Sequence, residues 1–508
     1  MGAVLGVAAA GFALETRGGE RAPSTTTTTT TLGPPTSADW ARLAASLTGS
    51  LVRPADAAYA SDALLYNAKF VDLHPQAIAY CASADDVARC VDFSTTRGLA
   101  FAARSGGHSY GGYSSCPGLV IDVSRLSSIS LDSRAGTAVV GAGAQLIDVY
   151  NELGRRGRLL PAGSCPSVGI AGLALGGGIG VFGRRYGLTS DNLRSLEAVT
   201  SDARVLTASD HQNADLLWAS RGGGGGNFAI ATSLEFTVHP LPEVSLFTLQ
   251  FPWSAAATLL EAWQHWIVAA PDELWSNCQL LAQGDYGYLA QVSGVYCGLP
   301  STLESLLATL HTSVGVPSYQ FVGSSAYVTA MAIEAGCSGL SIAACHLASR
   351  PHGTLSRSAY SAKSSYVDAP QSSARVAQFV DAVERLHDEA PTVGGGLAFD
   401  AYGGAINRVP ADATAFVHRD KLACIQATYS WADATPLTEV AAGERWLTWF
   451  GANVVDPTTG AYQNYIDPTL AHWATAYYGT NLERLMALKS RYDPENHFAF
   501  AQSIPVTH

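Results

Sequence analysis

Three glycine-rich stretches in the first half of the chain carry residue types that could hold a phosphate-bearing cofactor. RSGGHSYGG, at residues 104–112, places an imidazole, His108, among glycines, and the stretch 165–188 begins with a thiol, Cys165. The third stretch, RGGGGGNF, spans 221–228. Backbone N–H groups of such loops can close around phosphates because no side chain intrudes. Three loops of this kind predict a long cofactor lying across all of them, and a dinucleotide has the required length.

Several other cofactors and partners are disfavoured. No GxGxxG stands at a first strand–helix turn with an acidic residue about 20 positions later, so the nicotinamide fingerprint is absent. No CxxC pair occurs, and we expect no metal site. The 508 residues carry a formal net charge of −12 and contain no run of Lys or Arg. Nucleic-acid binding needs a basic face, so we expect no nucleic-acid partner.

Short alternating helices and strands must position the glycine loops between about residues 38 and 239. Apolar residues at helical spacing predict helices over 85–98 and 145–157. Apolar or alternating runs predict strands over 99–104, 118–126, 137–144 and 227–241. The first glycine loop follows the strand at 99–104 directly, which is the placement expected of a phosphate-binding loop.

The pattern changes after residue 240. Alternating apolar and polar residues predict antiparallel strands with one covered face. These strands span 244–253, 275–283, 288–298, 395–404 and 422–431. A helix is predicted over 373–390 between them. The last segment, 477–500, predicts a helix, a turn and a short strand.

The termini and cysteines suggest export. The apolar run 2–14 has the length of a signal-peptide core but lacks a basic start, and a disordered apolar tail is the alternative. A Thr/Pro-rich linker follows at 24–35. The nine cysteines are compatible with an oxidising compartment, and Cys337 and Cys345 could close a short disulfide loop. We therefore expect a secreted or exported protein, with a cytoplasmic one as the alternative, and no membrane helix.

Six motifs, in order along the chain, resemble the berberine-bridge-enzyme-like flavin oxidases. They are RSGGHSYGG, GSCPSVGIAGLALGGGIG, YGLTSDNL, RGGGGGNF, YQNYID and YDPENHF, and the resemblance covers about residues 51–505. It implies an α+β fold of the vanillyl-alcohol-oxidase type, with a two-part (PCMH-type) FAD-binding domain and a substrate domain built on an antiparallel sheet backed by helices. We expect a tail at 1–39, the FAD-binding domain at 40–239, the substrate domain at 240–454, and a segment at 455–508 that returns to the FAD-binding domain.

The resemblance also implies how FAD is held. His108 matches the histidine that bonds to the 8α-methyl group of FAD, and Cys165 matches the cysteine that bonds to C6. Taken alone, His108 could be a loop histidine and Cys165 a small buried residue. Val168 matches a small aliphatic residue that controls oxygen access, and valine there is typical of an oxidase. The other residues expected to contact FAD are Arg104, Ser105, Gly106, Gly107 and Ser109 at the diphosphate, Gly169, Gly172, Gly176, Gly177 and Gly178 at the ring and ribityl chain, and Asn192 and Ile230.

The family's catalytic positions are occupied by polar side chains. Tyr465, with Tyr462 beside it in the same motif, matches the general base, and Asp400 matches an aspartate that assists it in sugar-oxidising members. A free phenol has a pKa of about 10, so Tyr465 would act as a relay to Asp400. Gln426 stands where alkaloid-type members have a glutamate base, and an amide cannot be that base. Tyr402 is a further candidate. Without the resemblance, these tyrosines read as ordinary half-buried strand residues.

The predicted activity is an FAD-dependent oxidase that transfers hydride from a hydroxyl-bearing carbon of a carbohydrate or glycoside to bicovalently bound FAD and reduces O2 to H2O2. The expected partners are therefore a small hydroxylated substrate and O2. A tailoring oxidase of secondary metabolites, of antibiotic or alkaloid type, is the alternative within the same class. A flavin-loaded binding protein with little turnover is the alternative from another class.

Overall fold

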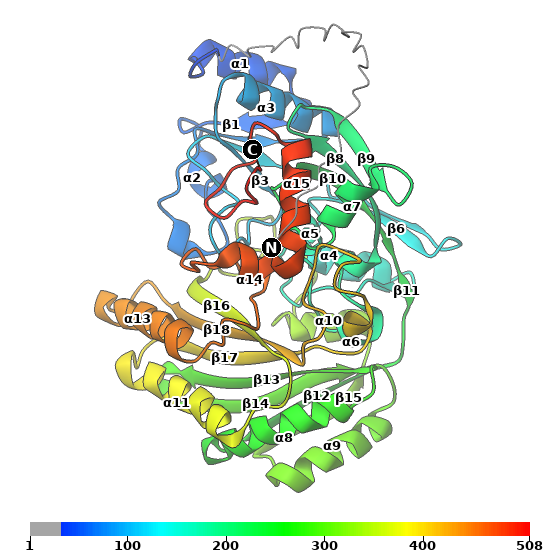
Figure 1. The fold of residues 1–508 in the computed structure, drawn as a ribbon, viewed down its shortest axis with the longest axis vertical. Helices are drawn as coiled ribbons and strands as arrows, with labels where there is room; N and C mark the ends of the chain where they lie inside the picture. Colours follow the sequence, from blue (N-terminus) through cyan, green and yellow to red (C-terminus); the bar gives the residue numbers. More distant parts are fainter. Residues whose placement is uncertain (1–31, 508) are drawn as a thin grey trace, which may run out of the picture.

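The computed structural model describes residues 32–507, which form two halves that face each other (Figure 1). The chain up to about residue 240 builds the upper half in that view, and residues 244–453 build most of the lower half. The final segment returns to the upper half, where α15 (Leu482–Tyr492) packs against α7 (Ala214–Ser220). The mixture of helices and largely antiparallel sheets confirms the predicted α+β class.

The first sheet carries the first glycine loop. In spatial order its strands are β1 (Ser50–Val52), β2 (Ala77–Tyr80), β4 (Leu119–Asp122) and β3 (Phe101–Arg104). β2, β4 and β3 are parallel, and the loop leaves the end of β3 as predicted. The helix α3 (Ala84–Thr96) begins where the Ser83 side chain accepts a hydrogen bond from the Asp86 N–H. It buries Val87 and Val91 and packs against α1 (Ser37–Ser46).

The second sheet is antiparallel and supports the second and third glycine loops. Its strands are, in spatial order, β5 (Ile129–Asp132), β6 (Thr137–Gly141), β10 (Ala229–Thr237), β8 (Leu193–Thr200) and β9 (Val205–Ser209). The third glycine loop lies between α7 and β10. Smaller elements complete this half: α2 (Tyr59–Asp62), α4 (Leu146–Gly154), α5 (Ile170–Leu175), α6 (Gly183–Tyr186), β7 (Arg158–Leu159) and β11 (His239–Pro240).

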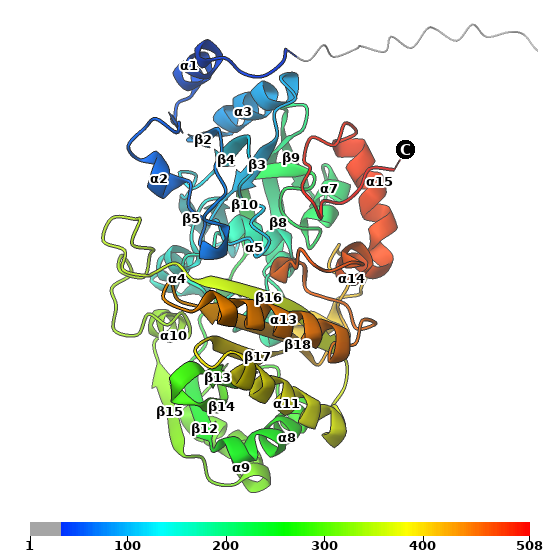
Figure 2. The same ribbon diagram turned by 90° about the vertical axis from the view of Figure 1, so that its left-hand side faces the viewer.

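A seven-stranded antiparallel sheet forms the centre of the lower half (Figures 1 and 2). In spatial order its strands are β15 (Tyr319–Ser325), β12 (Val244–Phe251), β14 (Tyr288–Tyr296), β13 (Leu274–Gln283), β17 (Gly394–Ala401), β18 (Ala423–Trp431) and β16 (Ala359–Val367). The helices of this half are α8 (Ala256–Ala269), α9 (Pro300–Val314), α10 (Tyr327–Glu334), α11 (Ser373–Glu389), α12 (Ala405–Arg408) and α13 (Leu437–Asn453).

Side chains alternate between the two faces of this sheet. On β13, Ser276 accepts a hydrogen bond from the indole of Trp263 on α8, and Cys278 and Leu280 are fully buried on the same face. Asn277, on the opposite face, points away from the helices. Helices α8, α11 and α13 therefore cover one face, and the polar face is left for a ligand.

The C-terminal segment differs from its prediction in one respect. The helix is α15, preceded by α14 (Trp473–Tyr478), but no strand forms over 497–500. Instead, Lys489 donates to the carbonyl oxygen of Phe498, and the N–H of Phe498 donates to the Asp493 carboxylate. The buried ion pair of Lys489 and Asp493 therefore binds backbone groups that a neighbouring strand would otherwise bind.

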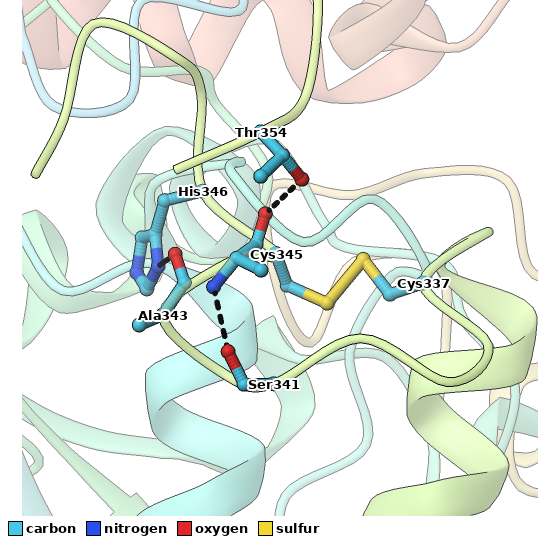
Figure 3. The surroundings of a disulfide bond; sticks show 7 residues. Cys337, Ser341, Ala343, Cys345, His346 and Thr354 are labelled. Carbon is cyan, nitrogen blue, oxygen red and sulfur yellow. Dashed lines mark hydrogen bonds between the residues drawn. A yellow bond between two sulfur atoms is a disulfide. The ribbon is translucent and has the colours of Figure 1, made fainter. Parts of the chain in front are cut away.

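The predicted disulfide between Cys337 and Cys345 is confirmed (Figure 3). The signal-like run and most of the Thr/Pro-rich linker lie outside the described residues. None of the helices formed within residues 32–507 combines the length and apolar character that a membrane span requires. The two sheet systems separate near residue 240, and we retain 40–239, 240–454 and 455–508 as the proposed domain boundaries.

Candidate active site

A cavity of about 620 Å³ lies between the two halves. One wall consists of the first two glycine loops, part of the third, and β10. The other consists of the polar face of the seven-stranded sheet, and residues 462–466 and 498–500 close the side. Ligand cavities of cofactor and substrate sites have volumes in this range.

The first two glycine loops touch each other at Gly106 and Gly169. A Cβ added to Gly106 would stand 2.3 Å from the backbone nitrogen of Gly169 and 2.7 Å from the carbonyl oxygen of Ser167. No side chain fits at such a distance, so glycine is required for the loops to meet. The meeting brings His108 and Cys165 to the same region of the cavity wall.

His108 is held as a neutral imidazole. Its ring stacks on Tyr66 with 3.9 Å between centroids, and its Nε2 atom lies 2.9 Å from the Ser167 hydroxyl. Burial lowers the pKa of His108 to about 3. The ring is therefore uncharged near neutral pH. Nδ1 makes no hydrogen bond with any described residue, and it is nucleophilic in the tautomer whose Nε2–H donates to Ser167.

Cys165 lines the same cavity and forms no disulfide. Although Cys165 is exposed to the open cavity, the protein around it raises the pKa of its thiol, and the charge of Asp400 adds to the rise. Burial and the charge of Cys165 both raise the pKa of Tyr66, whose ring stacks on His108. His108 and Cys165 therefore line one cavity, and their attachment to FAD stays a prediction.

A row of polar side chains crosses the sheet opposite the loops. Asn277 on β13 pairs directly with Asp400 on β17, and its Nδ2 atom donates to Asp400 Oδ1 at 2.5 Å. Gln426 on β18 lies opposite Ala398, one diagonal step from Asp400. Burial raises the pKa of Asp400 to about 6, although the bond from Asn277 opposes the rise. This carboxylate can therefore exchange a proton near neutral pH.

Tyr465 also faces the cavity, stacked on Tyr110 with 5.1 Å between ring centroids. The Tyr110 hydroxyl accepts a hydrogen bond from Gln426 Nε2 at 2.7 Å, while no described group bonds to the Tyr465 hydroxyl. Burial raises the pKa of Tyr465 well above 10, and the charge of Asp400 contributes. Tyr465 is therefore a neutral phenol with a free hydroxyl, and the negative charge of Asp400 acts on it.

Tyr462 has a different role from Tyr465. Its hydroxyl accepts hydrogen bonds from the N–H groups of Gly178 and Ile179 and from Asn464 Nδ2. Three donors fix this hydroxyl, so it anchors the 462–466 segment to the second glycine loop. The predicted contact of Gly176, Gly177 and Gly178 with the cofactor stays a prediction. These glycines do not line the cavity: Gly176 and Gly177 pack against the 462–466 segment and Phe416, and the Gly178 N–H donates to Tyr462.

Three further predicted residues bond to protein groups in this structure, and their roles at the cofactor or substrate stay predictions. Asn192 lies away from the cavity, and its amide donates to the carbonyls of Tyr186 and Leu188. Tyr402 is also outside the lining, and its hydroxyl lies 3.3 Å from that of Tyr366. Arg104 lines the wall, but its guanidinium is occupied by the Asp122 carboxylate and the Asp62 carbonyl. It holds the loop in place, which leaves phosphate binding to backbone N–H groups. The other predicted contacts line the cavity: Ser105, Gly106, Gly107, Ser109, Val168, Gly169, Gly172 and Ile230.

The sequence did not single out several cavity residues. Tyr110 stands inside the first motif, so the motif could have indicated it. Tyr66, Trp275 and Tyr360 carry no local signal, because only the packing of distant segments brings them to the cavity. Glu334, the last residue of α10, was missed for the same reason.

The cavity fits FAD by its shape and its chemistry. It extends from the glycine loops to the polar sheet, so a long ligand can bind backbone N–H groups at one end and meet a substrate at the other. Gln463 Oε1 is a buried acceptor that lines the cavity and has no partner among the described residues. A buried acceptor of this kind requires a donor from a ligand or water.

Comparison with known proteins identifies the family. The profile of the FAD binding domain family matches residues 75–209, and the profile described as berberine and berberine like matches 461–505. The FAD-linked oxidoreductase YgaK of Bacillus subtilis is 32% identical over 90% of this chain and 97% of its own length. Glucooligosaccharide oxidase of Sarocladium strictum is 30% identical over 85% of this chain and 88% of its own length.

The structures agree with this assignment. The Physcomitrella patens BBE-like 1 structure superposes with a TM-score of 0.82 and 30% identity, covering 92% of this chain and 99% of that one. FAD is accordingly the cofactor. With a relative 32% identical over nine tenths of its length and both family profiles in place, the chain belongs to the berberine-bridge-enzyme-like family of FAD-linked oxidoreductases.

Proposed function

We propose that the protein oxidises a hydroxyl-bearing carbon of a carbohydrate or glycoside, with FAD attached to both His108 and Cys165 and O2 reduced to H2O2. The main observation behind this proposal is that two different walls face each other across one cavity. Both candidate attachment side chains lie on one wall, and Asp400, Asn277 and Gln426 lie on the other. When bound, FAD accepts hydride from a substrate carbon and passes the electrons to O2.

The attachment atoms we propose are His108 Nδ1 and Cys165 Sγ. Each bond would replace one C–H bond of FAD, and O2, the oxidant of the proposed reaction, would accept the two electrons released with each bond. Ser167 occupies Nε2 of the neutral imidazole, so Nδ1 is the nitrogen left to form a bond. Cys165 lies in the cavity without a disulfide partner. The raised pKa of its thiol holds in the protein without FAD, so thiolate formation has to accompany attachment. Two bonds would hold the cofactor while the substrate side of the cavity stays open.

The substrate hydroxyl proton leaves through Tyr465 and Asp400. Tyr465 is a neutral phenol, so it can take a proton only by giving up its own. Asp400 is ionised above about pH 6 and its charge acts on Tyr465, so it is the carboxylate we propose as the proton acceptor. Gln426 has no basic atom, and through Tyr110 it holds the ring on which Tyr465 stacks. Val168 lines the cavity where oxygen would approach, which supports oxidase chemistry.

Carbohydrates are the proposed substrate class for two reasons. The sheet wall offers amide, hydroxyl and carboxylate groups that suit a ligand with many hydroxyls. Relatives named glucooligosaccharide oxidase and chitooligosaccharide oxidase align over most of the chain. The Cys337–Cys345 disulfide supports the further proposal that the protein works in an oxidising compartment outside the cytoplasm.

Anaerobic stopped-flow reduction tests the proposal. Mixing the holoenzyme with a panel of oligosaccharides should bleach the flavin absorbance, and admission of air should restore it with H2O2 formed. Bleaching by glycosylated metabolites alone would favour the tailoring oxidase. An absence of bleaching by any hydroxylated compound, with slow reoxidation after chemical reduction, would reject an oxidase and favour a flavin-loaded binding protein.

A further inference from the structure

Glu334 places a second carboxylate in the active-site cavity. It is the last residue of α10, it lines the cavity, and its side chain makes no hydrogen bond to any described residue. A carboxylate at the C-terminal end of a helix opposes the helix dipole. Burial and the charge of Asp400 raise the pKa of Glu334 to about 7. Local structure therefore disfavours this charge, and a ligand is the partner that would stabilise it.

The segment that carries Glu334 is fixed to the FAD-binding half. α10 packs against α4 so closely that a Cβ on Gly154 would stand 2.6 Å from the Val328 side chain. The Cys337–Cys345 disulfide closes the turn that follows (Figure 3). His346, in the same loop, pairs with Asp148 on α4 at 3.0 Å. Glu334 is therefore held in place at the cavity from both sides.

A third acceptor completes the subsite. Asn277 lines the same cavity and is only 7% exposed, and its buried Oδ1 atom has no partner among the described residues. Its Nδ2 atom is already used by Asp400, so the free oxygen awaits a donor. Among the described lining residues, Arg104 is the sole Lys or Arg, and it is paired with Asp122. No free cation in this lining would neutralise the two carboxylates.

We propose that Glu334, together with Asp400 and the Oδ1 atom of Asn277, forms an anionic subsite that selects hydroxylated substrates carrying an ammonium group, such as amino-sugar oligosaccharides, over neutral and acidic ones. An ammonium group offers three donors and a positive charge, and the subsite offers acceptors and negative charge. A uronic acid would bring a third carboxylate next to the other two. This inference rests on the proposed carbohydrate oxidation and specifies its substrate class.

The test compares three oligosaccharide series of equal length, built from glucosamine, glucose and glucuronic acid. The kcat/KM of flavin reduction is measured at about pH 7, where a large fraction of both the amine and Glu334 is charged. The wild type should prefer glucosamine over glucose, and Glu334→Gln should lower that ratio about tenfold, the effect of about 1.4 kcal/mol. Glu334→Asp, which keeps the charge, should retain most of the preference. Glu304→Gln, on the exposed face of α9, is the matched control and should change nothing.

Two results would overturn the inference without touching the proposed function. One is an unchanged glucosamine-to-glucose ratio in Glu334→Gln. The other is a wild type that turns over glucose and glucuronic acid oligomers as well as glucosamine oligomers. If no saccharide reduces the flavin, the proposed function fails, and the inference is then decided by binding. Glucosamine oligomers should raise the Tm of the wild type more than that of Glu334→Gln, and equal shifts would refute the subsite.

Discussion

The protonation of Asp400 should control the rate of substrate oxidation. Asp400 faces the cavity, and burial raises the pKa of its carboxyl from 3.8 to about 6. A base must be ionised to receive a proton, so kcat/KM should fall as the pH drops through 6 and level off above 7. At pH 5 about a tenth of the Asp400 side chains are ionised, and kcat/KM should be about a tenth of the plateau.

Two substitutions separate this explanation from others. Asp400→Asn keeps the hydrogen bond from Asn277 but removes the base, so kcat/KM should fall at least a hundredfold and lose its dependence near pH 6. Asn277→Leu removes the bond that lowers the pKa of Asp400. A hydrogen bond to a charged group contributes about 1.5–3 kcal/mol, which corresponds to one to two pKa units. The midpoint of the Asn277→Leu profile should therefore move upward by that amount.

The assay is anaerobic flavin reduction between about pH 4.5 and 8.5, since reoxidation by O2 is then excluded. Flavin absorbance of each variant is measured first, so that a loss of cofactor is not mistaken for a loss of base. A midpoint near 6 that survives in Asp400→Asn would show that another group titrates. If the midpoint of the Asn277→Leu profile moved to lower pH, the hydrogen bond from Asn277 could not be lowering the pKa of Asp400.

Three further outcomes are expected. Gly106→Ala should separate the two glycine loops, because its Cβ would clash with the backbone of Gly169. In-gel flavin fluorescence should then be lost, and full retention of that fluorescence would contradict the proposed loop contact. Tyr110→Phe removes the bond to Gln426 and should lower kcat/KM about fivefold with unchanged flavin content, whereas an unchanged rate would show that this bond does not position the site. Lys489→Met breaks a fully buried ion pair and should lower the free energy of unfolding by about 3–5 kcal/mol in a urea titration. A loss below about 1 kcal/mol would contradict the structural role of the ion pair.

Local patterns in the sequence predict much of the fold and one wall of the site. The strands β12, β13, β14, β17 and β18 follow from period-two alternation, since one face of their sheet is covered by helices and the other is polar. The glycine loops follow from composition alone, because few other arrangements explain such clustering. His108 and Cys165 could be paired only through the family resemblance, because 57 positions separate them and their contact depends on how the two loops pack.

The remaining features depend on long-range packing. Asn192 and Tyr402 stand near matched motifs, but their side chains form hydrogen bonds with neighbouring protein groups and do not line the cavity. Gly176–Gly178 contact the 462–466 segment, which is almost 290 residues away. Glu334 has no motif around it, and only the docking of α10 on α4 brings it to the site. Such contacts have no signature in one sequence.

We propose that one FAD is held by both His108 and Cys165 in the cavity between the halves. Mass spectrometry of the acid-denatured protein and of its proteolytic peptides tests this directly. We expect a protein heavier by one FAD, with the peptides containing residues 108 and 165 joined through the flavin, and with one bond lost in each of His108→Ala and Cys165→Ala. Release of all the flavin into the acid supernatant, or attachment at other residues, would contradict it.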